Sequence, residues 1–279
     1  MRNVDKSVVA DFGDEWSAYD QSGLTADEHR GMFEAYFHIF PWQQLPERAQ
    51  GMDVGCGSGR WARLVAPRVG KLHCVDPSAK ALEVARRNLE GQQNCELHLA
   101  SANDIPLPDG SLDFGYSLGV LHHVPDTEGA LLNCIRKLRP GAPFLLYLYY
   151  ALDNRPWWFR AVWRTSDGFR RLIAALPFAI KLPVTRLIAL TVYWPLARTA
   201  KLCEKLGIGA RNIPLSDYRN SSFYTMKTDA LDRFGTRLEK RYSRRRIQQM
   251  MEQGGLTDIR FSETAPFWCA VGLRVESSK

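Results

Sequence analysis

Paired cysteines, a leading apolar segment and long uncharged runs are all missing from this chain of 279 residues. The six cysteines are scattered and form no C-x-x-C pair, which argues against a zinc site or a disulfide framework. Arg2, Asp5, Lys6 and Asp11 interrupt the start of the chain, so an apolar secretion signal is not expected. These absences predict a cytoplasmic protein with reduced thiols.

Acidic residues are scarce between residues 155 and 205. This segment has ten Lys or Arg against two Asp or Glu, a net charge of +8, while the whole chain carries +7. The basic character of the protein therefore belongs to this one segment. Its longest uncharged run, Leu187 to Ala197, is about half of the roughly 20 residues that span a bilayer, and Pro177, Pro183 and Pro195 divide the segment. We expect no membrane-spanning helix here.

Glycine is concentrated at residues 51 to 59, which are Gly-Met-Asp-Val-Gly-Cys-Gly-Ser-Gly. Alternating glycines permit positive φ values and let the backbone approach a ligand closely. A dinucleotide fingerprint, G-x-G-x-x-G, would need a glycine where Arg60 stands. The spacing therefore disfavours a nicotinamide-dependent oxidoreductase.

Strand and helix patterns alternate after this turn. Helices are predicted at residues 78–88 and 126–138, and strands at 71–75, 95–99, 112–117 and 143–149. Strands joined by crossover helices form a parallel sheet. Strands at 258–262 and 267–275 are expected to complete it as a hairpin.

The glycine turn, with Asp53, Gly55, Cys56, Gly57 and Gly59, resembles the first motif of class I S-adenosylmethionine-dependent methyltransferases. The likeness is to small-molecule members with a type 11-like core. Asp76, followed by Pro77, matches the acidic residue that accepts hydrogen bonds from both ribose hydroxyls in that family. A carboxylate suits this role because it accepts in bidentate fashion.

Two further segments extend the resemblance. Residues 104–113 are similar to the family's adenine loop, although Ser101 stands where the family often has Asp. Adenine is therefore expected to be held through the backbone of Ser101 and Ala102 and through Asn103. Residues 117–126 resemble the segment near the transferable methyl, which implies cofactor contacts from Ser117, Leu118 and His122.

The resemblance implies an α/β fold: a Rossmann-like, doubly wound, mostly parallel seven-stranded sheet with a helical insertion after the fifth strand. The expected domains are an N-terminal helical cap (1–45), the cofactor-binding core (46–150), a basic and aromatic insertion or lid (151–228) and a C-terminal completion of the sheet (229–279). At the boundary between the insertion and the C-terminal domain, Thr228 is predicted to cap a short helix that ends at Gly235.

The segment Phe12-Gly13-Asp14-Glu15-Trp16 resembles an F-G-x-x-W pattern that folds over the cofactor in some small-molecule methyltransferases. Trp16 and Tyr19 would share a helix face and form an aromatic wall. Packing of this helix on the core would use the same residues, and both interpretations stay open.

The implied cofactor is S-adenosyl-L-methionine, and the product is S-adenosyl-L-homocysteine. A methyl on a sulfonium is already activated, so the enzyme must mainly align the acceptor and exclude water. His122, His123 and Tyr224 are the candidate catalytic residues. The candidate acceptor-binding residues are Tyr19, Tyr147, Tyr149, Tyr218, Arg219 and Arg241. No metal is expected, because the other histidines, His29, His38, His73 and His98, show no ligand spacing.

Three interpretations of the basic segment remain open. It forms a lid over the acceptor, or an interfacial surface with aromatic and aliphatic residues at the acyl boundary, or, least favoured, a nucleic-acid surface. Arg237, Lys240 and Arg241 would share one side of a helix and could bind a carboxylate or phosphate on the acceptor.

The favoured acceptor is a small apolar or amphipathic molecule that is lipid-linked or a natural product. Peripheral contact of the protein with the inner face of a membrane would suit such an acceptor. The alternatives are methylation of a macromolecule such as RNA and a noncatalytic cofactor-binding protein at a membrane interface. The oligomeric state is left open.

Overall fold

The computed structural model describes residues 3–210 and 212–275. It divides into two compact units. The core unit comprises Met1–Gln21, Arg30–Ala151 and Leu238–Lys279, and the helical unit comprises Ser22–His29 and Leu152–Arg237.

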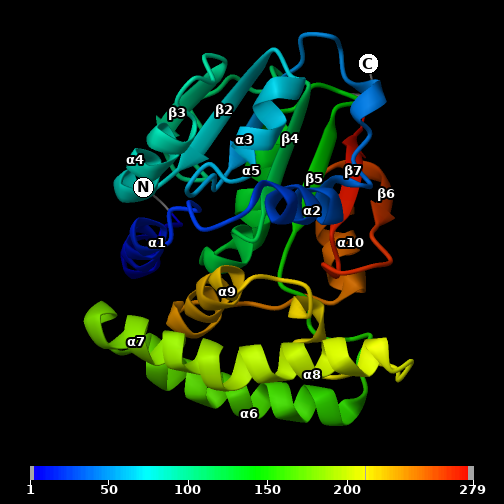
Figure 1. Cartoon of the computed structure of the whole chain (residues 1–279). Helices are drawn as coiled ribbons and strands as arrows, with labels where there is room; N and C mark the ends of the chain where they lie inside the picture. The colour runs from blue at the N-terminus through cyan, green and yellow to red at the C-terminus, as the bar shows by residue number, and fades with distance from the viewer. Residues whose placement is uncertain (1–2, 211, 276–279) are drawn as a thin grey trace. The chain divides into compact units, whose positions relative to one another are not determined.

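The core unit contains a seven-stranded sheet in the order β3-β2-β1-β4-β5-β7-β6 (Figure 1). Neighbours from β3 to β5 pair in parallel, and β7 pairs antiparallel with both β5 and β6. This confirms the predicted fold class. The strands are β1 (Gln50–Val54), β2 (Lys71–Asp76), β3 (Cys95–Leu99), β4 (Phe114–Leu118), β5 (Pro143–Tyr147), β6 (Leu256–Phe261) and β7 (Ala270–Arg274).

Four helices of the core unit begin at a polar residue whose side chain accepts backbone N–H groups. Asp5, Ser78, Asp126 and Ser243 cap α1, α4, α5 and α10 in turn. The helical segments here are α1 (Lys6–Ala18), α2 (Ala26–Phe37, whose first turn belongs to the helical unit), η1 (Trp42–Gln44), α3 (Ala62–Val65), η2 (Ala66–Arg68), α4 (Ala79–Asn88), η3 (Leu121–His123), α5 (Thr127–Lys137) and α10 (Arg244–Gln253).

Alternation along the strands divides the buried side chains between two clusters. Phe144 and Leu146 belong to one cluster, which also contains residues of α5 and α10. Leu145 belongs to the other, with Phe33 and Phe37 of α2. A strand sends successive side chains to opposite faces, so helices cover the sheet on both sides.

The helical unit contains α6 (Trp157–Ala174), α7 (Phe178–Ile188), the π-helical segment η4 (Ala189–Tyr193), α8 (Trp194–Lys205), η5 (Ser216–Tyr218) and α9 (Phe223–Gly235). Ala189, Tyr193, Met226, Ala230 and Phe234 are buried together between η4 and α9. No helix among residues 3–210 and 212–275 is both long and apolar enough to span a membrane.

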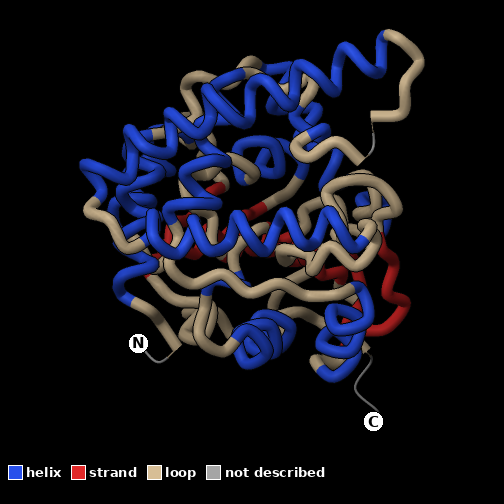
Figure 2. The backbone as a smooth tube through the Cα atoms, turned by 90° about the horizontal axis from the view of Figure 1, so that it is seen from below, coloured by secondary structure: helices blue, strands red, loops and turns tan. Residues whose placement is uncertain are grey.

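Two local predictions for this unit are wrong. Pro183 and Pro195 do not divide their segment, because α7, η4 and α8 follow without a break, with Pro183 inside α7 and Pro195 in the first turn of α8 (Figure 2). Thr228 does not cap a helix. Ser222 caps α9 instead by accepting the N–H of Thr225, and Thr228 lies inside that helix, where its hydroxyl donates to the Tyr224 carbonyl at 3.1 Å.

Candidate functional site

The glycine-rich turn leaves the carboxyl end of β1 and is attached to β2. Gly55, Gly57 and Gly59 have φ values of 77°, 54° and 76°, in the left-handed region that a Cβ disfavours. The N–H groups of Gly55 and Cys56 donate to the Val75 carbonyl at 2.7 and 3.1 Å. The backbone of β2 therefore fixes the turn.

The space beside the turn has no room for larger residues. A Cβ on Gly55 would lie 2.3 Å from Val120 Cγ1, and one on Gly57 would lie 2.8 Å from Trp16 Nε1. Val120 and Trp16 therefore pack directly against the backbone of the turn, and glycine is required at both positions.

Asp76 links the turn to the helix that follows β2. Its Oδ2 accepts the Gly57 N–H at 2.9 Å, and its Oδ1 accepts the Ser78 N–H at 2.8 Å. Burial raises the pKa of this carboxyl to about 6, although the two hydrogen bonds lower it. Each oxygen of a carboxylate can accept a second bond, so Asp76 retains capacity for two ligand hydroxyls.

Asp53 is buried at the end of β1 and accepts the Tyr116 hydroxyl at 3.0 Å. Burial raises the pKa of Asp53 to about 8, against the effect of this hydrogen bond, and the charge of Asp76 adds to the rise. A carboxyl with this pKa ionises readily when a cation binds nearby. The sulfonium and amino groups of the proposed cofactor are such cations.

Asp53→Asn is expected to flatten the dependence of stability on pH. A folded pKa above the unfolded value gives a contribution to stability that is complete below about pH 4 and is lost as pH rises through about 8. Urea-unfolding midpoints measured from pH 5 to 8 should therefore fall more steeply for wild type than for Asp53→Asn. If the urea midpoints of the two proteins fall equally with pH, the raised pKa of Asp53 is contradicted.

The segment after β3 contains the residues that the sequence predicts to hold adenine. Ser101 and Ala102 are buried, and Ser101 Oγ lies 3.1 Å from Asp104 Oδ2. The Asn103 side-chain oxygen accepts an N–H from Asn3 at 2.9 Å. Asp104 therefore places a carboxylate beside Ser101, a contact that the sequence analysis missed.

The end of β4 leads to the predicted methyl-transfer region. Ser117 is fully buried and donates to the Val54 carbonyl at 2.9 Å, and Leu118 is buried beside it. Gly119 then turns with a φ of 78°, and η3 carries His122 and His123. The turn thus places both histidines next to the strand that adjoins β1.

His122 is fully buried, and among the residues that the structure describes neither ring nitrogen has a hydrogen-bond partner. Its ring lies 4.0 Å from that of Tyr149 and 3.9 Å from that of His123, measured between centroids. Burial lowers the pKa of His122 well below its usual value, and His123 and Arg241 contribute. The ring is therefore neutral at pH 7, and one of its nitrogens carries a lone pair.

His123 differs because its Nδ1 lies 2.6 Å from the Leu238 carbonyl oxygen. The two histidines are therefore distinguishable: His123 contacts the Leu238 carbonyl, whereas neither nitrogen of His122 has a hydrogen-bond partner among the described residues. Sequence alone does not separate them.

The segment 238–242 brings Arg241 to the same region. The Tyr242 N–H donates to the Tyr149 carbonyl at 2.8 Å. Arg241 lies over the Tyr149 ring at 5.2 Å and binds Glu239 at 2.7 Å. Tyr147 lies nearby, with 6.1 Å between its ring centroid and that of Tyr149. Tyr147 and Tyr149 therefore form an aromatic wall, and the Arg241 guanidinium, which is paired with Glu239, lies against it.

The proposed single-sided helix with Arg237, Lys240 and Arg241 does not form, because residues 236–242 are outside any helix. Arg237 donates to the Ala174 carbonyl within the helical unit, and Lys240 donates to the carbonyls of Val124 and Pro125 in the core unit. The Lys240 backbone N–H donates to the His122 carbonyl at 3.2 Å, and the Arg241 side chain lies over the Tyr149 ring.

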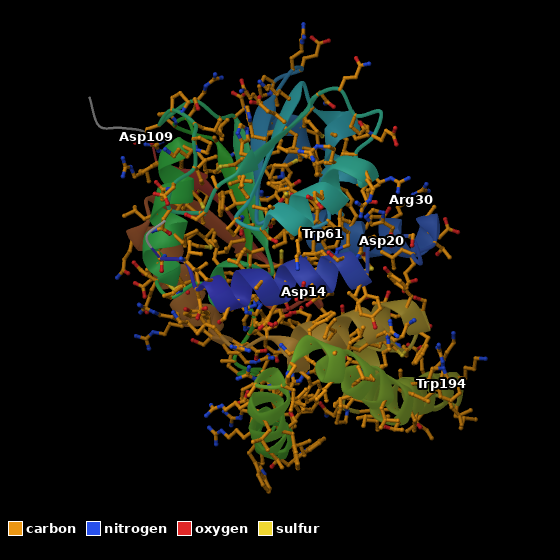
Figure 3. All side chains as sticks on the ribbon, turned by 90° about the vertical axis from the view of Figure 1, so that its left-hand side faces the viewer. Asp14, Asp20, Arg30, Trp61, Asp109 and Trp194 are labelled. Atoms are coloured by element: carbon orange, nitrogen blue, oxygen red, sulfur yellow. The ribbon has the colours of Figure 1, made fainter. Side chains whose placement is uncertain are left out.

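Helix α1 lies along the glycine turn. Trp16 is next to Gly57, and Tyr19 is buried. Figure 3 shows α1, which carries Asp14, beside the segment with Trp61, and Asp14 pairs with Lys80 of α4 at 2.6 Å. Phe12 contacts the His123 ring at 4.9 Å, which the F-G-x-x-W resemblance could have suggested.

Three predicted residues belong to the helical unit. Tyr218 packs against Tyr193, and Arg219 binds Glu204 through both carboxylate oxygens at 3.0 Å. Tyr224 packs against Gly23. Each has a structural contact within its unit, and their roles in acceptor binding and catalysis stay predictions.

Comparison with known families agrees with this geometry. Residues 52–146 match the model of the methyltransferase domain family. The chain is 33% identical over 163 residues to a ubiquinone biosynthesis O-methyltransferase of Thiobacillus denitrificans, covering 56% of this chain and 66% of that one. It is 31% identical over 147 residues to a demethylmenaquinone methyltransferase of Bacillus licheniformis, covering 50% and 62%. It thus spans less than two thirds of either relative.

A solved structure shows the same fold. The methyltransferase in a complex with the Trm112 activator of Haloferax volcanii aligns with a TM-score of 0.51 at 15% identity, covering 96% of this chain and 99% of that one. The Rossmann-like architecture is therefore shared.

Proposed function

We propose that this chain, which carries a class I S-adenosylmethionine-dependent methyltransferase domain, transfers a methyl group from S-adenosylmethionine to a small amphipathic acceptor. The observation that supports this most strongly is the Gly57–Asp76 contact. It joins a turn of left-handed glycines to a buried carboxylate at the ends of adjacent parallel strands. Ligands of open α/β sheets bind at this edge.

The cofactor contacts follow from the residues around that turn. Asp76 accepts the ribose hydroxyls, the backbone of Gly55, Cys56, Gly57 and Gly59 borders the methionine part, and Trp16 covers it. Pro77 follows Asp76 along this wall, Ser101, Ala102 and Asn103 border adenine, and Ser117 and Leu118 border the sulfonium side. When bound, the cofactor supplies a methyl group already activated by the sulfonium.

His122 accepts the proton that an acceptor hydroxyl or acidic carbon releases. Its ring is neutral, and neither nitrogen has a hydrogen-bond partner within residues 3–210 and 212–275, so a lone pair is available for this. Tyr147 and Tyr149 exclude water from the same region. Arg241, held by Glu239, attracts a polar or anionic group on the acceptor.

The acceptor class follows from the chemistry of this wall. Three aromatic rings and one held guanidinium suit a molecule with an apolar body and a polar group. The names of the two relatives refer to quinone biosynthesis, which agrees with such an acceptor.

The experiment is incubation of full-length protein with cell extract and cofactor labelled on the methyl group. Label is expected in the organic-soluble pool. Label in RNA or protein would replace the proposed acceptor with a macromolecule. Cofactor binding without transfer into any pool would indicate the noncatalytic alternative.

Peripheral contact with an anionic membrane fits the helical unit. Each of its long helical runs has a row of exposed apolar side chains at helical spacing. The rows comprise Trp158, Val162, Phe169 and Leu172 on α6, and Ile180, Leu187, Leu190 and Trp194 on the α7–α8 run. Trp194 projects from this run in Figure 3. Large apolar surfaces of this kind mark binding faces.

The charges favour a lipid surface over a second copy of the chain. Both acidic residues of the 155–205 segment are already paired: Asp167 binds Arg170 and Arg171, and Glu204 binds Arg219. Two copies would bring two segments of net charge +8 together. Anionic headgroups complement that charge, and the apolar rows suit the acyl boundary.

The double variant Leu187→Asp, Leu190→Asp is expected to bind anionic vesicles at least tenfold more weakly than wild type, because transfer of two exposed leucine side chains into the acyl region is worth about 3–6 kcal/mol. Cosedimentation with phosphatidylcholine vesicles, with and without phosphatidylglycerol, measures this. Leu132→Asp, at an exposed leucine of the core unit, is the control. If wild-type protein does not cosediment with anionic vesicles, the proposed membrane contact is wrong.

A further inference from the structure

Three side chains of metal-ligand type meet at the edge of the sheet, on two strands that are separated in the sequence by residues 77–94. His73 lies on β2, and Glu96 and His98 lie on the edge strand β3 (Figure 1). The parallel register pairs His73 with Glu96 and Val75 with His98. Residues two apart on a strand share a face, so register alone brings the three side chains together.

The ligand atoms are spaced as a small cation requires. His73 Nδ1 lies 2.9 Å from His98 Nε2 and 3.6 Å from Glu96 Oε2, and His98 Nε2 lies 3.7 Å from Glu96 Oε1. One ligand atom from each residue lies within 4.8 Å of the others. In a tetrahedral site with bonds of 2.0–2.2 Å, ligand atoms lie about 3.3–3.6 Å apart. The observed separations bracket that range.

We propose that His73, Glu96 and His98 bind one divalent transition-metal ion, with Zn²⁺ as the best match. Two imidazoles and one carboxylate form a donor set that Zn²⁺ prefers, and they leave a fourth position for water. The ion ties the edge strand β3 to β2, the strand that ends at Asp76.

Gln50 of β1 contacts the His73 ring on the side away from the other two ligands. Its side-chain amide lies 2.7 Å from His73 Nε2, the ring nitrogen that faces away from the other two ligands. Turning the amide presents its oxygen to an Nε2–H, which leaves the lone pair of Nδ1 for the metal. Ligating histidines usually have such a partner, because it fixes tautomer and ring orientation.

Lys71 competes with the metal. Its ammonium lies 2.7 Å from Glu96 Oε2, and its side chain is 46% exposed. A flexible exposed lysine can move into solvent when a divalent ion takes the carboxylate. Lys71→Met is therefore expected to bind Zn²⁺ severalfold more tightly than wild type, and equal or weaker binding would contradict the competition.

The test is calorimetric titration of the tag-free, full-length protein with Zn²⁺, and visible spectroscopy with Co²⁺, whose absorption distinguishes imidazole and carboxylate ligands from thiolates. One ion per chain is expected. His98→Ala and Glu96→Gln should each weaken Zn²⁺ binding at least tenfold, and Gln50→Leu about tenfold. His38→Ala is the matched control, since His38 is exposed and outside the cluster, and should bind as wild type does.

A second measurement separates ligation from simple loss of structure. Zn²⁺ should raise the thermal midpoint of wild type and not that of His98→Ala, while both proteins show the same circular dichroism without metal. Absence of stoichiometric binding by wild type would overturn the site. So would binding that persists undiminished in both His98→Ala and Glu96→Gln.

Discussion

Asp76→Ala is expected to weaken binding of S-adenosylhomocysteine by about 30- to 1,000-fold, which corresponds to about 2–4 kcal/mol. The variant loses the acceptor of the ribose hydroxyls, and it also releases the Gly57 and Ser78 N–H groups that Asp76 holds. Isothermal titration calorimetry measures the change. Asp109→Ala is the control, because Asp109 is an exposed carboxylate of the same unit whose partners are Arg136 and Lys137.

The pH profile adds a sharper test of the same residue. The pKa of Asp76 is about 6, and hydroxyl donors prefer the ionised carboxylate, so wild-type affinity should fall as pH decreases through about 6. Asp76→Asn cannot ionise and should lack this step. Unchanged affinity in Asp76→Ala, or the same step in Asp76→Asn, would remove Asp76 from the cofactor site.

His122→Phe is expected to lower turnover by about 10²- to 10⁴-fold while leaving stability near wild type. Phenylalanine keeps the ring contacts with His123 and Tyr149. It also removes two buried nitrogens without protein partners among the described residues, so folding should not suffer. Transfer of labelled methyl into the pool that wild type labels measures turnover.

His123→Phe is the comparison variant. It loses the contact with the Leu238 carbonyl, so its main effect should be on the thermal midpoint rather than on the methyl-transfer step. If His122→Phe transfers methyl groups as fast as wild type, the ring is part of the packing and another group accepts the proton.

Local features of the cofactor side were predictable from sequence because each depends on a few neighbouring residues. The glycine turn needs positive φ at three positions, and those positions contain the only residue type that adopts it freely. Ser78 and Ser243 could be identified as caps in the same way. The alternation of strands and helices predicts a parallel sheet, and the family resemblance implied its doubly wound, seven-stranded form.

Two kinds of feature were not predictable from sequence: those that depend on which of several residues caps a helix, and those that depend on contacts between residues far apart in the chain. Thr228 has the chemistry of a cap, but Ser222 starts α9 six residues earlier, and helices continue through a threonine without difficulty. Helical packing keeps Pro183 and Pro195 within one run. The prediction that no metal binds was drawn from spacing along the chain, whereas the register of β2 and β3 brings His73, Glu96 and His98 together.

The acceptor side was predictable only in part for the same reason. His122, Tyr147 and Tyr149 follow strand ends and could be assigned from the order of the sheet. The partners that distinguish them come from elsewhere: Phe12 from α1, and Leu238 and Glu239 from the segment before α10. The F-G-x-x-W pattern points to Phe12, but sequence spacing shows neither the Leu238 contact nor the Glu239 contact.

Titration of the full-length protein with S-adenosylhomocysteine and, separately, with NADH tests the central claim most directly. The glycine turn and Asp76 predict that one S-adenosylhomocysteine binds per chain and that NADH gives no heat of binding. Binding of NADH, or absence of S-adenosylhomocysteine binding by folded protein, would contradict the account.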